Sequence, residues 1–539
     1  MPFDLSTMTR RSLLLGSAAL SATVLLDGSA GRVVAAERKH GGTLTVLLSA
    51  EPPTITTIAH TAFNSVFVSA KATEGLLAYD FDLTPKPQLA TAWSVSPDGL
   101  RYTFTLRQGV KWHDGRDFTA DDVAFSIRAI KDVHPRGRST FGNLAEVQTP
   151  DAHTVILILS KPAPYLISAF AAAETPIIPK HLYDGQKVDA NPVSNAPVGT
   201  GPFVFREWVR GSHIAYERNP NYWDAPKPYV DRLIIRFIPD GAARAAALET
   251  GEVQIAPGTP IPLSDVERLK ALPNLKFETR GYEYTNSISR IEFNLDKPYF
   301  QDVRVRRAFA HAIDRNVIHK VVNYGYGTPI PGPFSVNLKR FYLPDLPIYA
   351  FDPARAEKLL DEAGLPRRDG GVRLRLVHDY VPSNESYRRG AEYIKQALGR
   401  IGVDVSVRSQ DFATYTKRVY TDRDFDFTYN GMSNLFDPTV GVQRLYWSKN
   451  FKPGVPFSNG SHYASPEVDG LLEAAAVEVD PDKRVEQFAR FQEVIARDVP
   501  DIGITTAPDF TIHDRRVRDH TVGADGLSGN LADVYFAAP

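Results

Sequence analysis

Residues 89–115 read LATAWSVSPDGLRYTFTLRQGVKWHDG, and residues 118–123 continue with FTADDV. Between Tyr102 and Leu106 the side chains alternate between apolar and polar, which predicts a strand with one buried face. Residues 96–99, SPDG, predict a tight turn before that strand, because glycine accepts the positive φ that such turns need. Thr119 and the acidic residues after it predict a helix start. The stretch therefore predicts a strand hairpin followed by a helix.

Apolar runs rich in β-branched residues predict further strands on both sides of this stretch. In the first half they lie at residues 43–49, 155–159, 203–209 and 233–237. In the second half, strands are expected at residues 374–377, 403–407 and 425–429, and helices at 302–322, 353–363, 385–400, 412–421, 466–479 and 481–497. Strands that alternate with helices favour βαβ units, so the second half predicts a mostly parallel sheet.

The chain has 539 residues, enough for several domains' worth of mass. The two halves are interpreted as separate α/β units. An extended run at residues 287–295 joins them, and a second extended run at residues 501–506 leads back. Two connecting strands of this kind are a device for closing two lobes on a ligand.

Composition excludes several classes of function. Lysine and arginine total 62 and aspartate and glutamate 63, a balance that argues against a general nucleic-acid-binding surface. The absence of cysteine excludes disulfides, thiolate metal sites, a cysteine nucleophile and a lipidated cysteine. The G-x-S-x-G, phosphate-loop and H-E-x-x-H patterns are missing as well. We therefore expect no cofactor, no metal and no catalytic residues.

The N-terminus has the three-part pattern of an export signal. Arg10 and Arg11 precede an apolar stretch from Leu13 to Leu26, and small residues follow at Val34–Ala36. The apolar stretch is too short to span a bilayer, and the paired arginines favour the twin-arginine route. We expect a signal peptide at residues 1–36 and a mature protein in the periplasm.

Several motifs occur in a fixed order along the chain. Beside residues 89–123 they are PVGTGPF at 197–203, RNPNYW at 218–223, FN at 293–294, DVRVRRA at 302–308, AID at 312–314 and DP at 352–353 leading to LLDEAG at 359–364. Together they resemble the peptide/opine/nickel class of bacterial solute-binding proteins, family 5, which serve ABC importers. The resemblance implies an α/β, type II periplasmic-binding-protein-like fold with two lobes and a two-strand hinge.

The resemblance also implies domain boundaries. Lobe I is expected at residues 41–285 plus 500–539, with an inserted subdomain at about 80–190. Lobe II is expected at residues 286–499. Most motif residues are interpreted as markers of this scaffold and not as ligand contacts, because receptors for different ligands share it.

Peptide receptors of this class hold the ligand's ammonium with an aspartate in the segment after a strand of the second lobe. The resemblance places Asp437 in that role. The alternative is that Asp437, which precedes Pro438, only caps a helix. Met432 and Asn434, in the same segment, stand where many members have tryptophan and aspartate, and these departures weaken the expectation of a standard peptide ligand.

Three further residues are candidate ligand contacts. Arg290 stands in the connection between the lobes, where it could bind a carboxylate bidentately or form a salt bridge across the hinge. Phe63 and Asn64 follow the first strand, where relatives place pocket residues. Phe63 fits a core position equally well.

The expected function is a periplasmic receptor that captures a short peptide or peptide-like molecule and delivers it to the permease of an ABC importer. The expected partners are this ligand and the inner-membrane permease subunits, without nucleic acid, and the receptor is expected to be a monomer. Two alternatives remain open. One keeps the receptor but changes the ligand to an opine, a metal chelate, haem or a saccharide. The other is an exported hydrolase, which would need a catalytic pair in the cleft.

Overall fold

The largest sheet of the computed structural model has seven strands. The structure describes residues 38–346 and 349–538, so the predicted signal peptide at residues 1–36 lies outside the described residues. In order, the strands are β12 (Leu275–Glu278), β18 (Thr511–Asp514), β11 (Ile255–Ala256), β1 (Thr43–Leu48), β10 (Arg232–Phe237), β9 (His213–Arg218) and β8 (Phe203–Val209). β1 and β10 are parallel, with Thr43 opposite Arg232. The strand β18, from the C-terminal part of the chain, thus lies among strands of the first half.

The 89–123 stretch forms the hairpin and helix that its pattern predicts. β4 (Ala90–Val95) and β5 (Arg101–Leu106) pair antiparallel, and Gly99 in the turn has a φ of 68°. The backbone N–H of Thr119 donates to Asp122 Oδ2 at 3.0 Å, which completes the capping box of α2 (Ala120–Val133). The strands β4 and β5 belong to a four-stranded sheet that is completed by β7 (Thr154–Leu159) and β6 (Leu144–Asp151).

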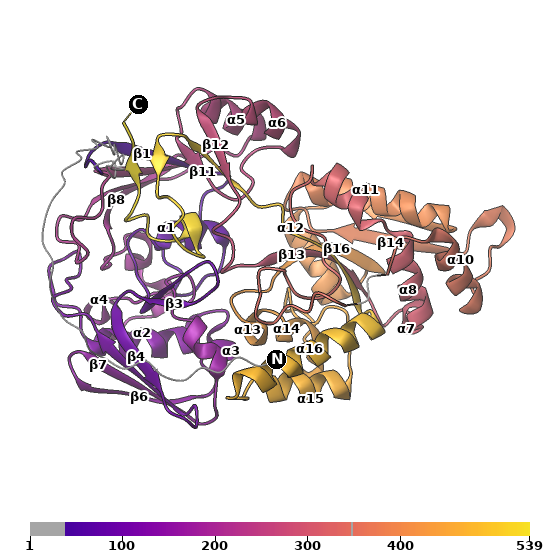
Figure 1. The fold of residues 1–539 in the computed structure, drawn as a ribbon, viewed down its shortest axis with the longest axis horizontal. Helices are drawn as coiled ribbons and strands as arrows, with labels where there is room; N and C mark the ends of the chain where they lie inside the picture. Colours follow the sequence, from indigo (N-terminus) through magenta and orange to yellow (C-terminus); the bar gives the residue numbers. More distant parts are fainter. Residues whose placement is uncertain (1–37, 347–348, 539) are drawn as a thin grey trace, which may run out of the picture. The chain divides into compact units, whose positions relative to one another are not determined.

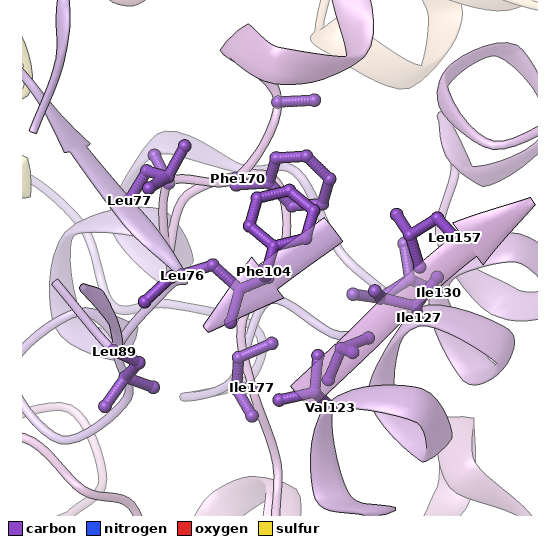
Figure 2. Close-up of a cluster of buried hydrophobic side chains, with 14 of the residues drawn as sticks. Leu76, Leu77, Leu89, Phe104, Val123, Ile127, Ile130, Leu157, Phe170 and Ile177 are labelled. Atoms are coloured by element: carbon purple, nitrogen blue, oxygen red, sulfur yellow. The ribbon is translucent and has the colours of Figure 1, made fainter. Parts of the chain in front are cut away.

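The alternating residues of β5 face an apolar core, as predicted. Tyr102, Phe104 and Leu106 are all buried. In Figure 2 the ring of Phe104 lies beside that of Phe170, and their centroids are 4.8 Å apart. Val123, Ile127 and Ile130 of α2 belong to the same core. Burial of these large side chains holds α2 on the four-stranded sheet.

A second large sheet is built from the later part of the chain. Its five strands are β15 (Val403–Arg408), β14 (Leu374–Tyr380), β16 (Phe427–Ser433), β13 (Ser287–Phe293) and β17 (Asp501–Thr506). The longer helices around it are α8 (Val303–Ala312), α10 (Pro353–Glu362), α11 (Glu385–Arg400), α15 (Pro466–Ala475) and α16 (Pro481–Asp498). Figure 1 shows α11 along β14, and α15 beside α16.

The prediction of a mostly parallel sheet is wrong. β14 runs parallel to β15 and β16, but β13 runs antiparallel to both β16 and β17. The parallel pair β14–β15 is joined through helix α11, as a βαβ unit requires. β13 enters from residues of the seven-stranded sheet, with no such crossover before it. The mixed α/β class itself is confirmed.

The helix predicted at residues 302–322 is interrupted. α8 ends at Ala312, and Asp314 caps the next short helix by accepting from Asn316 N. A single π-helical turn then covers residues 318–322. The aspartate offers the backbone a local hydrogen bond that competes with helix continuation.

Two segments link the seven-stranded and five-stranded sheets. Residues 279–286 lead from β12 into β13, and residues 507–510 lead from β17 into β18. The backbone N–H of Ala507 donates to the carbonyl of Ser287 at 2.8 Å, so the two links meet at one end of the five-stranded sheet. In the described part of the chain, every helix is too short or too polar to cross a membrane. The boundaries given for the two lobes stay predictions.

Candidate ligand-binding site

Three strand ends converge where the two links meet. Ser287 begins β13 and lies opposite Ser433, the last residue of β16, with their Oγ atoms 3.1 Å apart. β17 ends beside them at Thr506, before Ala507. The loop that follows β16 and the link that follows β17 therefore leave the sheet at the same edge, which we call the strand-end site (residues 287, 433 and 507).

Met432 and Asn434 flank Ser433 but are buried in internal contacts. Met432 is 2% exposed and belongs to an apolar cluster. Asn434 Oδ1 accepts from Ser335 N at 2.6 Å, while its amide donates to the carbonyl of Pro333 at 3.1 Å. Asn434 thus fixes the segment around residue 335 against the strand-end site. A ligand contact for either residue stays a prediction.

Asp437 caps a helix, as the second interpretation of this residue proposes. It is 3% exposed, and its Oδ1 accepts from Thr439 N at 2.8 Å at the start of α13 (Pro438–Gly441). Both carboxylate oxygens also accept from Arg484 of α16, at 2.7 and 2.8 Å. Asp437 therefore already has a cationic partner inside the chain. Its predicted contact with a ligand ammonium stays a prediction.

Arg290 lies in the middle of β13 and is 2% exposed. Its guanidinium pairs with Glu292 at 2.8 Å and with Asp501 of β17 at 2.5 Å. Burial lowers the pKa of Arg290, but the two carboxylates outweigh burial and raise it well above the ordinary value. Tyr446 also donates to Asp501, at 2.6 Å. The pair with Asp501 joins β13 to β17, the two strands expected to connect the lobes, and a ligand contact for Arg290 stays a prediction.

Phe63 and Asn64 begin α1 (Phe63–Ser69) and differ in their surroundings. The Phe63 side chain is exposed, at 42%, and its ring lies against Gly258. Asn64 donates to the carbonyl of Ala50 at 2.8 Å and so holds the loop after β1. Phe63 is therefore a surface aromatic next to the 258–259 turn and not a core residue.

Asp509 is a charged residue that the sequence reasoning missed. Thr259 holds the backbone on both sides of it, with its N–H on the carbonyl of Phe510 at 3.0 Å and its hydroxyl on that of Pro508 at 2.6 Å. Among residues 38–346 and 349–538, no ion pair or hydrogen bond reaches the Asp509 carboxylate. Burial raises its pKa to about 6. A usable signal was present, because Asp509 is the only charged residue between Ile502 and Ile512.

Arg444 is a second charged residue near the strand-end site that was not predicted from the sequence. It lies on α14 (Gln443–Tyr446) and donates to the carbonyls of Gly441, Phe457 and Ser433. No carboxylate lies within ion-pair distance of it in the described part of the chain. Burial, followed by the charges of Arg136 and Arg290, lowers its pKa to about 10. Arg444 is the only charged residue between Asp437 and Lys449, so its isolation was visible in the sequence.

A cavity of about 280 Å³ lies elsewhere and contains none of the six predicted residues. Most of its acidic residues are ion-paired: Asp224 and Asp533 with Lys227, Asp519 with Arg38, and Asp80 with Lys86. Asp525 of this cavity lies near the buried Lys71, whose ammonium donates to two backbone carbonyls. These contacts hold the C-terminal segment on the seven-stranded sheet. The predicted residues Met432 and Asn434 flank the strand-end site instead, so we keep that site as the candidate.

A family model matches most of the chain. The model of bacterial extracellular solute-binding proteins, family 5 Middle, matches residues 84–460. The glutathione-binding protein GsiB of Salmonella typhimurium is 30% identical over 472 residues, covering 86% of this chain and 88% of that relative.

Solved structures show the same fold. The periplasmic binding protein DppA from Helicobacter pylori, in complex with the peptide STSA, matches with a TM-score of 0.78 and 27% identity, covering 93% of this chain and 99% of that one. NikZ from Campylobacter jejuni, in complex with Ni(L-His), matches with a TM-score of 0.79 and 25% identity, covering 92% and 99%. The chain therefore has the mixed α/β fold of type II periplasmic binding proteins.

Proposed function

Because the chain belongs to the bacterial extracellular solute-binding proteins of family 5, we propose that it is the receptor of an ABC importer and carries a short peptide or peptide-like molecule to the permease. The family match over residues 84–460 carries this proposal. The peptide complex of DppA and the glutathione-binding function in the name of GsiB support the ligand class. The relatives' function as binding proteins argues against the hydrolase alternative.

The ligand would be held between two lobes that close on it. Lobe I would comprise residues 41–285 and 500–539, and lobe II residues 286–499. The seven-stranded sheet and the five-stranded sheet support this division, because only residues 279–286 and 507–510 link them. A ligand that touches both lobes binds the closed form better and shifts the population toward it. Export to the periplasm would place the receptor beside its permease.

Calorimetry tests the ligand class. The purified protein is titrated with the peptide Ser-Thr-Ser-Ala, with glutathione and with the nickel–histidine complex. Binding of either peptide, with a raised melting temperature, supports the proposal. Binding of the nickel complex alone would move the protein to the metal-chelate alternative. Small-angle scattering with the bound ligand should show a smaller radius of gyration, and an unchanged radius would contradict closure.

A further inference from the structure

The cavity of about 280 Å³ lies where the C-terminal segment meets the first half of the chain. Its walls come from residues 70–88, 172–173, 222–227 and 519–533. Figure 1 shows the C-terminal segment beside α1. Val522, which is 61% exposed, lines the cavity as well. A solute can therefore reach the cavity from the surface.

One carboxylate of this cavity has no partner. Five aspartates and two lysines line the cavity. Four of the aspartates are ion-paired, namely Asp80, Asp224, Asp519 and Asp533. The fifth, Asp525, has neither an ion pair nor a side-chain hydrogen bond within residues 38–346 and 349–538. Asp525 is therefore the acidic group of the cavity that is left for a ligand.

The buried Lys71 lies near Asp525 but is engaged elsewhere. Its ammonium donates to the carbonyls of Leu527 at 2.6 Å and Gly529 at 2.5 Å, and it lies 4.1 Å from the centroid of the Phe67 ring. Burial raises the pKa of Asp525 to about 7, and the charge of Lys71 offsets this effect only in part. The carboxylate thus loses hydration without gaining a partner in the described part of the chain.

Aromatic rings form another part of the cavity wall. Tyr79, Tyr222 and Trp223 line it. The Tyr222 hydroxyl and the Trp223 N–H donate to Glu74 at 2.8 and 2.9 Å, so these rings offer a ligand only their apolar surface. The guanidinium of Arg107 already lies 4.0 Å from the centroid of the Trp223 ring. Aromatic rings of this kind attract cations.

We propose that this cavity is a second binding site, separate from the strand-end site, for a small organic cation whose ammonium group pairs with Asp525. The carboxylate would accept charge-assisted hydrogen bonds from the ammonium, and the aromatic rings would cover the alkyl part of the ligand. A calcium ion fits less well, because it takes six or more oxygen ligands and the neighbouring aspartates already have cationic partners. The bound cation would fasten residues 519–533 to residues 70–88.

Three compounds of equal chain length test the charge requirement. Calorimetry and thermal unfolding of the full-length protein compare butylammonium with 1-butanol and butyrate. Butylammonium should bind and raise the melting temperature, and the other two should do neither. Asp525→Asn keeps the size of the side chain and should weaken butylammonium by at least about 10-fold, as expected for the loss of a hydrogen bond between charged groups. The exposed Asp404→Asn should leave the affinity unchanged.

Hydrogen exchange followed by mass spectrometry locates the site without a variant. Butylammonium should slow exchange in residues 70–88 and 519–533 and leave β13 unchanged. The inference is overturned if butylammonium does not bind, if it binds Asp525→Asn equally well, or if it protects only other segments. Binding of calcium in place of butylammonium would overturn it too. If Asp525→Asn fails to fold, the protection pattern and the comparison with 1-butanol decide. The proposed receptor function is tested separately with Ser-Thr-Ser-Ala, whose binding none of these outcomes changes.

Discussion

Asp437 and Arg484 form a two-pronged ion pair, with Nη1 to Oδ2 at 2.8 Å and Nη2 to Oδ1 at 2.7 Å. Both side chains are almost completely buried. The same carboxylate caps α13 through Thr439. One aspartate thus joins the loop after β16 to helix α16, 47 residues further along the chain.

Removing this carboxylate should strongly destabilise the fold. Asp437→Ala leaves the Arg484 guanidinium buried without its partner, a change that costs about 3–5 kcal/mol in comparable pairs. Urea unfolding followed by circular dichroism measures the loss. Asp480 also caps a helix, α16, but is half exposed. Asp480→Ala should therefore cost only about 1 kcal/mol, as for an ordinary cap. Equal losses in the two variants would mean that the pair with Arg484 adds no stability.

Arg290 should be as important to stability as Asp437. Arg290→Met leaves Glu292 and Asp501 buried without a cation, so we expect a loss of about 3–5 kcal/mol in the free energy of unfolding. Adding Glu292→Gln to this variant should recover part of the loss, because one uncompensated charge disappears. Arg375→Met, at an exposed position, should change stability by less than about 0.5 kcal/mol. A variant at Arg290 that unfolds like the unmodified protein would contradict this account.

Local patterns predicted the elements well, and the reason is physical. The alternation at residues 102–106, the capping box at Thr119 and the helix at residues 385–400 depend on neighbours in sequence. Strand direction depends on which segments pair over long distances. β13 pairs with strands more than 130 residues away, and no local signal specifies that they run antiparallel to it.

The candidate site was harder to predict because charge pairing is a long-range property. Asp437 and Arg290 stood out by type and position, and each has a partner far along the chain. Asp509 and Arg444 are distinguished only by having no ion-pair partner within the described residues. This absence can be recognised only after the positions of all the charged side chains are known. The signal available in the sequence was that each of these two residues is the only charged residue in its stretch of chain. If such a residue is buried, no charged neighbour in the sequence can neutralise it.

Glu74 offers a test of a buried carboxylate held by neutral donors. It accepts from Tyr222 Oη at 2.8 Å and from Trp223 Nε1 and Thr200 Oγ1 at 2.9 Å. Glu74→Gln replaces one acceptor oxygen with an NH₂ group that faces donors, so we expect a loss of about 1–3 kcal/mol. Burial raises the pKa of Glu74. Its contribution is therefore largest at acid pH and falls as pH rises, and the loss in Glu74→Gln should be smaller at pH 8 than at pH 5.

Unfolding measurements at both pH values test this, with the exposed Glu217→Gln as control. A loss that grows between pH 5 and pH 8 would contradict the raised pKa of Glu74. An unchanged free energy of unfolding at both values would show that the three donors find other acceptors.

Asp509 should make the unliganded protein less stable as pH rises. Its pKa is raised from 3.8 to about 6 in the folded state, so the folded state holds the proton more tightly than the unfolded state. The stabilisation is complete below about 3.8 and is lost as pH rises through about 6, which amounts to roughly 3 kcal/mol by pH 8. The Tyr282 and Tyr387 hydroxyls near it have raised pKa values and stay neutral over this range.

Asp509→Asn removes this dependence. The variant should match the unmodified protein near pH 4 and exceed its free energy of unfolding by roughly 3 kcal/mol at pH 8. Urea unfolding at both pH values measures the difference, and the exposed Asp404→Asn should show none. A variant that is no more stable at pH 8 than the unmodified protein would mean that water or a neighbouring group already solvates the Asp509 carboxylate and that its pKa is not raised in the folded state.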